Sequence, residues 1–90
     1  MDGQAQRKAL TAAEQALRAL GSRDADAAER AAGRAHELDQ TGVYAAFPTA
    51  IGGAAAEIRR GEPVSEATWD NLEQALGPGP LAAVVVSLRS

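Results

Sequence analysis

Apolar residues recur at helical spacing in the first twenty residues of the chain. Leu10, Ala13, Leu17 and Leu20 lie three or four positions apart, so they share one face of a helix. A glycine follows directly, at the position where this residue commonly ends a helix. The pattern predicts a helix over residues 4–20 whose buried face carries leucines.

The second segment repeats the helical spacing with smaller residues. Asp24 or Asp26 is suited to cap its start, since a side-chain oxygen there accepts hydrogen bonds from the free backbone N–H groups of the first turn. The expected buried positions are mostly alanine: Ala28, Ala31 or Ala32, Ala35 and Leu38. We predict a helix over residues 24–39, and its short connection to the first helix predicts an antiparallel hairpin.

A stripe of larger apolar residues marks the third segment. Its members are Tyr44, Phe47, Ile51, Ala54 or Ala55, and Ile58. Pro48 interrupts the stripe, because proline lacks the backbone N–H and clashes with the preceding turn. The stripe continues on both sides of the proline, which favours a kinked or two-piece helix over residues 43–60; a helix that starts near Phe47 is the alternative. We expect Gly52 and Gly53 to let another helix approach closely.

The last third of the chain predicts two shorter helices. Ser65 is suited to cap a helix over residues 66–76, and Val64 and Trp69 have the spacing of a hydrophobic staple across its first turn. A final helix is expected over residues 80–89, where a proline opens the segment. The Val-Val-Val run there also suits a strand, but no second strand is predicted to pair with it, which favours the helix.

These elements predict an all-α fold, in which residues 1–90 form a single domain. We expect a bundle of four to five helices that opens with the antiparallel hairpin. Alanine accounts for 22 of the 90 residues, whereas large apolar side chains are few. A domain this small buries only roughly 60% of its unfolded surface, and alanine adds little apolar area. The core is therefore expected to be thin, so self-association or a partner protein would add stability.

The charge pattern argues against several classes of partner. The net charge is −3 and the eight arginines are scattered among acids, whereas nucleic-acid binding favours basic residues concentrated on one face. The polar N-terminal segment lacks the apolar core of a signal peptide, and no apolar run approaches the roughly 20 residues that span a bilayer. We therefore expect a cytoplasmic protein that binds neither nucleic acid nor membrane. The excess of arginine over lysine, with abundant alanine and glycine, suggests a GC-rich bacterial genome.

Candidate catalytic and metal-binding groups are few. The chain has no cysteine and one histidine, His36, and helical geometry places only Asp39 on the same face. Two ligands do not complete a zinc site. Capping and the helix dipole account for Asp24, Asp26 and Glu29. The sequence predicts no catalytic residue, no metal site and no cofactor, and we expect a protein that is not an enzyme.

The segment AHELDQ and the alanines before it have the pattern of a known repeat. Ala28 and Ala35 fall on the small-residue positions, and AHELDQ supplies the closing leucine and acid, so residues 9–40 resemble one tetratricopeptide unit. Glutamine stands where that family has proline, and the first helix lacks the family's bulky residues. The resemblance implies a helical hairpin that acts in protein binding. Such units bury a continuous core only when stacked, so the remaining helices would have to complete it.

Five large apolar residues are the candidates for contact with a partner: Tyr44, Phe47, Trp69, Val85 and Leu88. Either all three aromatic residues anchor the core, or Tyr44 and Trp69 line a groove between helices. Val85 and Leu88 lie in the apolar C-terminal segment, which a monomer would cover poorly. We therefore expect a non-catalytic protein-interaction module that buries a helix or peptide of a partner. The alternative is a structural homo-oligomer, such as a homodimer, assembled through the C-terminal helix.

Overall fold

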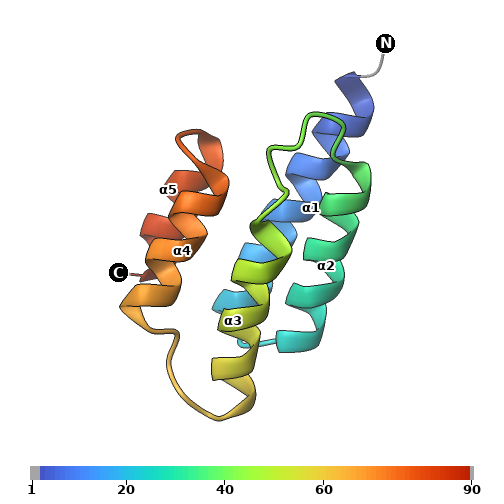
Figure 1. Ribbon diagram of the computed structural model, residues 1–90. Helices are drawn as coiled ribbons and strands as arrows, with labels where there is room; N and C mark the ends of the chain where they lie inside the picture. Colours follow the sequence, from blue (N-terminus) through green and yellow to red (C-terminus); the bar gives the residue numbers. More distant parts are fainter. Residues whose placement is uncertain (1–2, 90) are drawn as a thin grey trace.

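The computed structural model describes residues 3–89, which form α-helices that run alternately in opposite directions (Figure 1). These helices are α1 (Gly3–Gly21), α2 (Ala25–Leu38), α3 (Phe47–Arg59), α4 (Glu66–Leu76) and α5 (Pro80–Arg89). The predicted all-α fold with an antiparallel opening hairpin is therefore confirmed, and the described residues contain no strand. Residues 1, 2 and 90 of the expected single domain lie outside the described range.

Helices α1, α2 and α3 form a unit that we call the three-helix unit. Its most extensive contact is between α1 and α2, and α3 lies against α2. The buried alanines of the first two helices are Ala9, Ala12, Ala13 and Ala16 on α1 and Ala25, Ala28, Ala32 and Ala35 on α2. Because these side chains are a single methyl group, the two helix backbones can approach closely.

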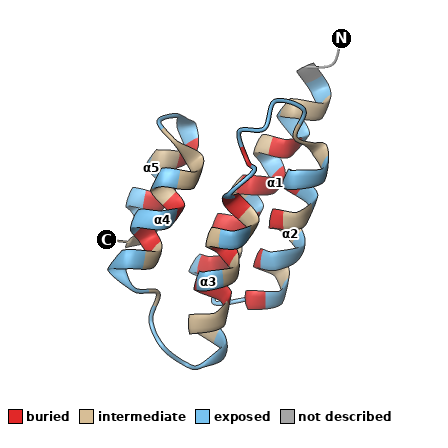
Figure 2. Cartoon of the chain, viewed as in Figure 1, coloured by how far each residue is buried: buried red, intermediate tan, exposed pale blue. Residues whose placement is uncertain are grey.

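Helices α4 and α5, which we call the C-terminal pair, pack on this unit through larger side chains. Helix α4 contacts α3, and α5 contacts α1. Trp69, Leu72, Leu81 and Val85 are the buried residues of the pair. They belong to a hydrophobic cluster to which all five helices contribute, and the buried positions face inward between the helices (Figure 2).

The predicted caps begin two of the helices. Of the two candidates at the start of α2, Asp24 is the cap, and its Oδ1 accepts from the backbone N–H of Ala27 at 3.0 Å. Ser65 caps α4, where its Oγ accepts from the backbone N–H of Thr68 at 3.3 Å. Each cap satisfies a backbone donor that has no partner inside the helix.

The start of α3 differs from the favoured prediction. The helix begins at Phe47, so the kinked helix over residues 43–60 is wrong and the alternative start is right. Pro48 lies in the first turn, where its missing N–H would have no intrahelical partner and its fixed φ suits a helix. Residues 43–46 form turns instead, so Tyr44 precedes the helix.

These turns are built around the carboxylate of Asp39. It accepts hydrogen bonds from the backbone N–H groups of Thr41, Gly42 and Tyr44 and from Gln6 Nε2 of α1, at 2.9–3.1 Å. Partial burial raises the pKa of this carboxyl, but the hydrogen bonds outweigh it and bring the pKa to about 2, below the ordinary 3.8. Asp39 therefore fastens the start of α1 to the loop that leads into α3.

The close helix approach expected at Gly52 and Gly53 is absent. A Cβ added to Gly53 would meet no atom within 4 Å, and one added to Gly52 would only touch the Glu29 carboxylate at 4.0 Å. A close contact occurs instead at the end of α1, where a Cβ on Gly21 would lie 2.8 Å from Cδ2 of Leu88. Gly21 therefore gives space to a leucine of α5, and Gly53 leaves open space beside α3.

Candidate functional site

The five residues predicted to contact a partner lie in or against the core of the monomer. Tyr44, Phe47, Trp69 and Val85 are buried, none with more than 8% of its surface exposed, and Leu88 is partly buried against them. The rings of Tyr44 and Phe47 are 6.0 Å apart in a tilted arrangement. Within the single chain these side chains therefore act as core anchors, one of the two roles that the sequence left open for the aromatics.

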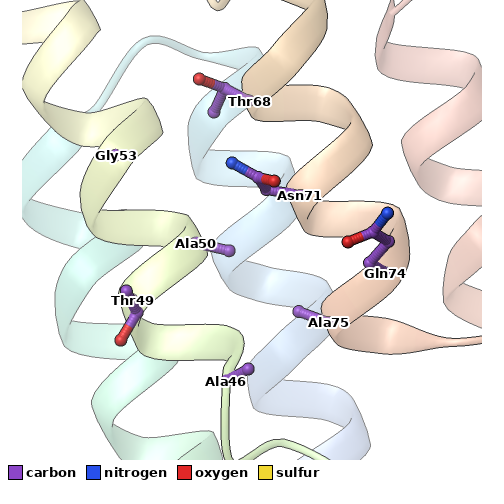
Figure 3. Close-up of a pocket in the computed structure, with 8 residues that line it drawn as sticks. All are labelled: Ala46, Thr49, Ala50, Gly53, Thr68, Asn71, Gln74 and Ala75. Carbon is purple, nitrogen blue, oxygen red and sulfur yellow. The ribbon is translucent and has the colours of Figure 1, made fainter.

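The largest hollow that we identify on the surface is a groove between α3 and α4, with a volume of about 540 Å³. Figure 3 shows the residues that line it, which come from the α3 side and from α4. Thr49, Ala50 and Gly53 belong to α3, Ala46 directly precedes that helix, and α4 contributes Thr68, Asn71, Gln74 and Ala75. The volume is within the range of about 300–1,000 Å³ that is typical of ligand sites in proteins.

The two walls of the groove follow from the sequence of each helix. On the α3 side the lining positions are spaced i, i+3, i+4 and i+7, so they form one face, and all carry small side chains. Phe47 and Ile51 lie on the other side of that helix and are fully buried. On α4 the buried residues Trp69 and Leu72 turn toward the core, which leaves the amide side chains beside the groove.

The lining residues carry neutral polar groups and no titratable side chain. Asn71 and Gln74 are exposed, and neither amide makes a hydrogen bond to another part of the described chain. Each amide offers both donors and an acceptor. Thr68, in contrast, already shares a hydrogen bond of 2.9 Å with Ser65 Oγ. The groove can therefore bind a ligand through shape and hydrogen bonds. Its lining has no acid, base or strong nucleophile for catalysis.

The acidic and histidine side chains considered in the sequence analysis do not form a site in the structure. Among residues 3–89, no three acidic or histidine side chains come together in a way that could hold a metal ion. His36 is exposed on α2, and Asp39 is committed to the loop before α3. The described helices include none that is both long and apolar enough to cross a membrane.

Comparison with known proteins gives no matching family model and no significant match among curated proteins or solved structures. The function is therefore inferred from the residues of the groove. Sequence reasoning missed these residues because it searched for large apolar and titratable side chains. The signal present was a second stripe, at Ala46 just before α3 and at Thr49, Ala50 and Gly53 within it, whose small residues repeat at helical spacing.

Proposed function

We propose that the chain is a non-catalytic protein-interaction module that binds a helix or peptide of a partner in the groove between α3 and α4. The observation that carries the proposal is the pairing of a small-residue wall on α3 with two amide side chains on α4 that have no partner in the described chain. The resemblance of residues 9–40 to a tetratricopeptide unit supports the same role. A cytoplasmic location is part of this proposal.

The groove suits a polypeptide better than a charged ligand. Alanine and glycine on α3 let a partner backbone come close, which increases van der Waals contact. Asn71 and Gln74 can then hydrogen-bond polar groups of the partner and fix its register. The lining has no formal charge, so affinity would come from shape, apolar contact and these amides.

Photo-crosslinking tests the proposal. A photoreactive amino acid at Gln74 should give a covalent adduct with a partner protein, and the same group at the exposed Gln15 of α1 should not. Gly53→Leu should remove the adduct because it fills the groove. Gly33→Leu is the matched control, since an added Cβ meets no atom within 4 Å at either glycine and only Gly53 lines the groove.

Two results would contradict the proposal. One is an adduct that survives Gly53→Leu in a protein of unchanged helicity. The other is an equal yield of adducts from the two crosslinking positions, which would indicate random collision.

A homo-oligomer assembled through α5 is the second candidate. Val86 on this helix is 56% exposed, so α5 presents an apolar side chain at the surface. Light scattering over a wide concentration range tests it. A constant monomer mass would exclude this candidate. A stable dimer would support it, provided that Val86→Glu on the exposed face of α5 returned the protein to a monomer.

A further inference from the structure

The ion pairs between helices of the described chain fall into two separate groups. In the three-helix unit, Arg59 of α3 contacts Asp26 of α2 at 2.6 Å and Glu29 of α2 at 2.5 Å. These contacts lower the pKa of Asp26, chiefly through the hydrogen bond from Arg59. They fasten α3 to α2, and they stay inside the three-helix unit.

The second group lies inside the C-terminal pair. Arg89 of α5 contacts three acids of α4: Glu66 at 3.1 Å, Asp70 at 3.2 Å and Glu73. The side chain of Arg89 is only 21% exposed, so this cluster is better shielded from water than that of Arg59, which is 45% exposed. None of the ion pairs found among residues 3–89 joins α4 or α5 to the three-helix unit.

The connection between the two units is a short linker that comprises residues 60–65 and is exposed except at Val64, which packs against the core (Figure 2). Its first residues continue the end of α3, because the backbone N–H groups of Gly61 and Glu62 donate to the carbonyls of Ile58 and Glu57. Two further hydrogen bonds hold the rest of it. Ser65 donates its backbone N–H to the Glu57 carboxylate at 3.2 Å, and Arg23 donates to the carbonyl of Glu62 at 2.7 Å. Gly61 has a φ of +76°, so its backbone adopts a conformation that suits glycine and few other residues.

The side chains through which the two units pack against each other are apolar. Leu20, near the end of α1, lies beside Trp69 and Leu88, and Leu88 occupies the space left by Gly21. Pro63 and Val64 of the linker also lie there, and the remaining contacts are made by residues of one unit with residues of the other. These remaining contacts can form equally between α4–α5 of one chain and the three-helix unit of another. Only the path of the linker would change.

We propose that the C-terminal pair is an exchangeable unit, and that its partner is the three-helix unit of a second copy of this chain. The product is a dimer in which the interface between the C-terminal pair and the three-helix unit occurs twice, each time between two chains. The linkers extend from one chain to the other. A short linker gives the intramolecular contact an effective concentration of roughly 1 mM, so dilute protein is monomeric. The exchange places Val85 and Leu88 in contact with a partner, and it does not rest on the groove proposal.

Shortening the linker tests the exchange. Deletion of residues 61–63 removes up to about 10 Å of chain, so α4 can no longer fold back beside its own α3. We expect the mass measured by light scattering to double while the helical circular dichroism signal is kept. An insertion of three residues at the same place is the matched control and should stay monomeric. A deletion variant that is a cooperatively folded monomer would overturn the proposal.

A second measurement decides the matter if the deletion variant does not fold. The chain has no native cysteine, so single cysteines can be placed at Ala46, directly before α3, and at Ala75 of α4, which line the same groove. The two variants are refolded together at about 1 mM, diluted, and treated with a short bismaleimide. Exchange predicts a covalent heterodimer joining positions 46 and 75.

The control pairs Ala75→Cys with Thr11→Cys, an exposed position on α1. A yield of the 46–75 adduct above this control supports exchange. An equal yield overturns it, even if light scattering detects dimers, because a dimer formed by side-by-side contact leaves each C-terminal pair on its own chain.

Discussion

The two outer hairpins of the fold, α1–α2 and α4–α5, are stabilised in different ways. The first joins helices of 19 and 14 residues along a seam of buried alanines. The second joins helices of 11 and 10 residues, which are held by a few large side chains and by the Arg89 ion cluster. The alanine seam spreads its contacts over many positions, whereas the short hairpin concentrates them in a few.

This difference determines which changes each hairpin tolerates. A single alanine contributes little apolar area, so its loss is a small effect, but the closely packed seam has no space for a larger side chain. In the C-terminal pair each large residue carries much of the buried area, so truncation leaves a cavity. We therefore expect α1–α2 to be sensitive to added volume and α4–α5 to be sensitive to removed volume.

Leu72→Ala should have the largest effect of the changes considered. Leu72 is fully buried, and truncation of such a leucine typically costs about 2–5 kcal/mol of unfolding free energy. Urea denaturation followed by circular dichroism measures the loss. Hydrogen exchange should show the amides of α4 and α5 losing more protection than those of α1 and α2. Leu76→Ala, at a partly exposed position of the same helix, should cost less. Equal losses for the two variants would contradict the concentration of stability in a few residues.

Ala28→Leu tests the opposite sensitivity in the alanine seam. Ala28 is fully buried on α2, and overpacking of this kind typically costs about 1–3 kcal/mol. Thermal unfolding measures the effect. Ala27→Leu is the control. Ala27 is adjacent to Ala28 but only partly buried, and leucine is a good helix former. If both variants were as stable as the parent chain, the seam would not be closely packed.

Asp39→Asn tests the polar contact that fastens the end of the α1–α2 hairpin to the next loop. Hydrogen bonds to a charged group contribute about 1.5–3 kcal/mol, and we expect a loss on the order of 1–2 kcal/mol because asparagine keeps some of them. Asp39 has a folded pKa of about 2 against an ordinary 3.8, so its contribution is present above pH 4 and lost as the pH falls toward 2. The variant should therefore lose stability less steeply over that interval. Glu37→Gln, an exposed change nearby, should keep the parental slope.

The features that sequence reasoning found are those set by local spacing. The residue ranges of α4 and α5 were predicted as observed, because caps and glycine or proline boundaries are local signals. The favoured start of α3 was wrong because the apolar stripe through Tyr44 continues into a turn held by Asp39, a tertiary contact that also involves Gln6. A buried side chain outside a helix can extend an apparent helical stripe.

The groove and the division into two units depend on which helices become neighbours. In the sequence, Asn71 and Gln74 are indistinguishable from ordinary exposed residues. They line a groove only because α3 packs beside α4. The ion pair of Arg59 with Asp26 joins residues 33 positions apart, so no helical spacing could indicate it. The acids that contact Arg89 lie at 66, 70 and 73, on one face of α4, but their common partner comes from another helix.

Replacing each of these arginines in turn should have the smallest effect and sharpens the comparison between the hairpins. We expect Arg89→Gln to lower the melting temperature more than Arg59→Gln, because Arg89 contacts three acids and is 21% exposed, whereas Arg59 contacts two and is 45% exposed. Raising the salt concentration to about 1 M shortens the Debye length to about 3 Å and should reduce both differences, that of Arg59 more completely. Arg34→Gln, on the exposed face of α2, controls for the loss of a positive charge alone. If Arg59→Gln had the larger effect, the Arg89 ion cluster would not be the stronger of the two ion groups. The C-terminal pair would then depend mainly on its large apolar side chains, and the contrast between the two hairpins would rest on packing.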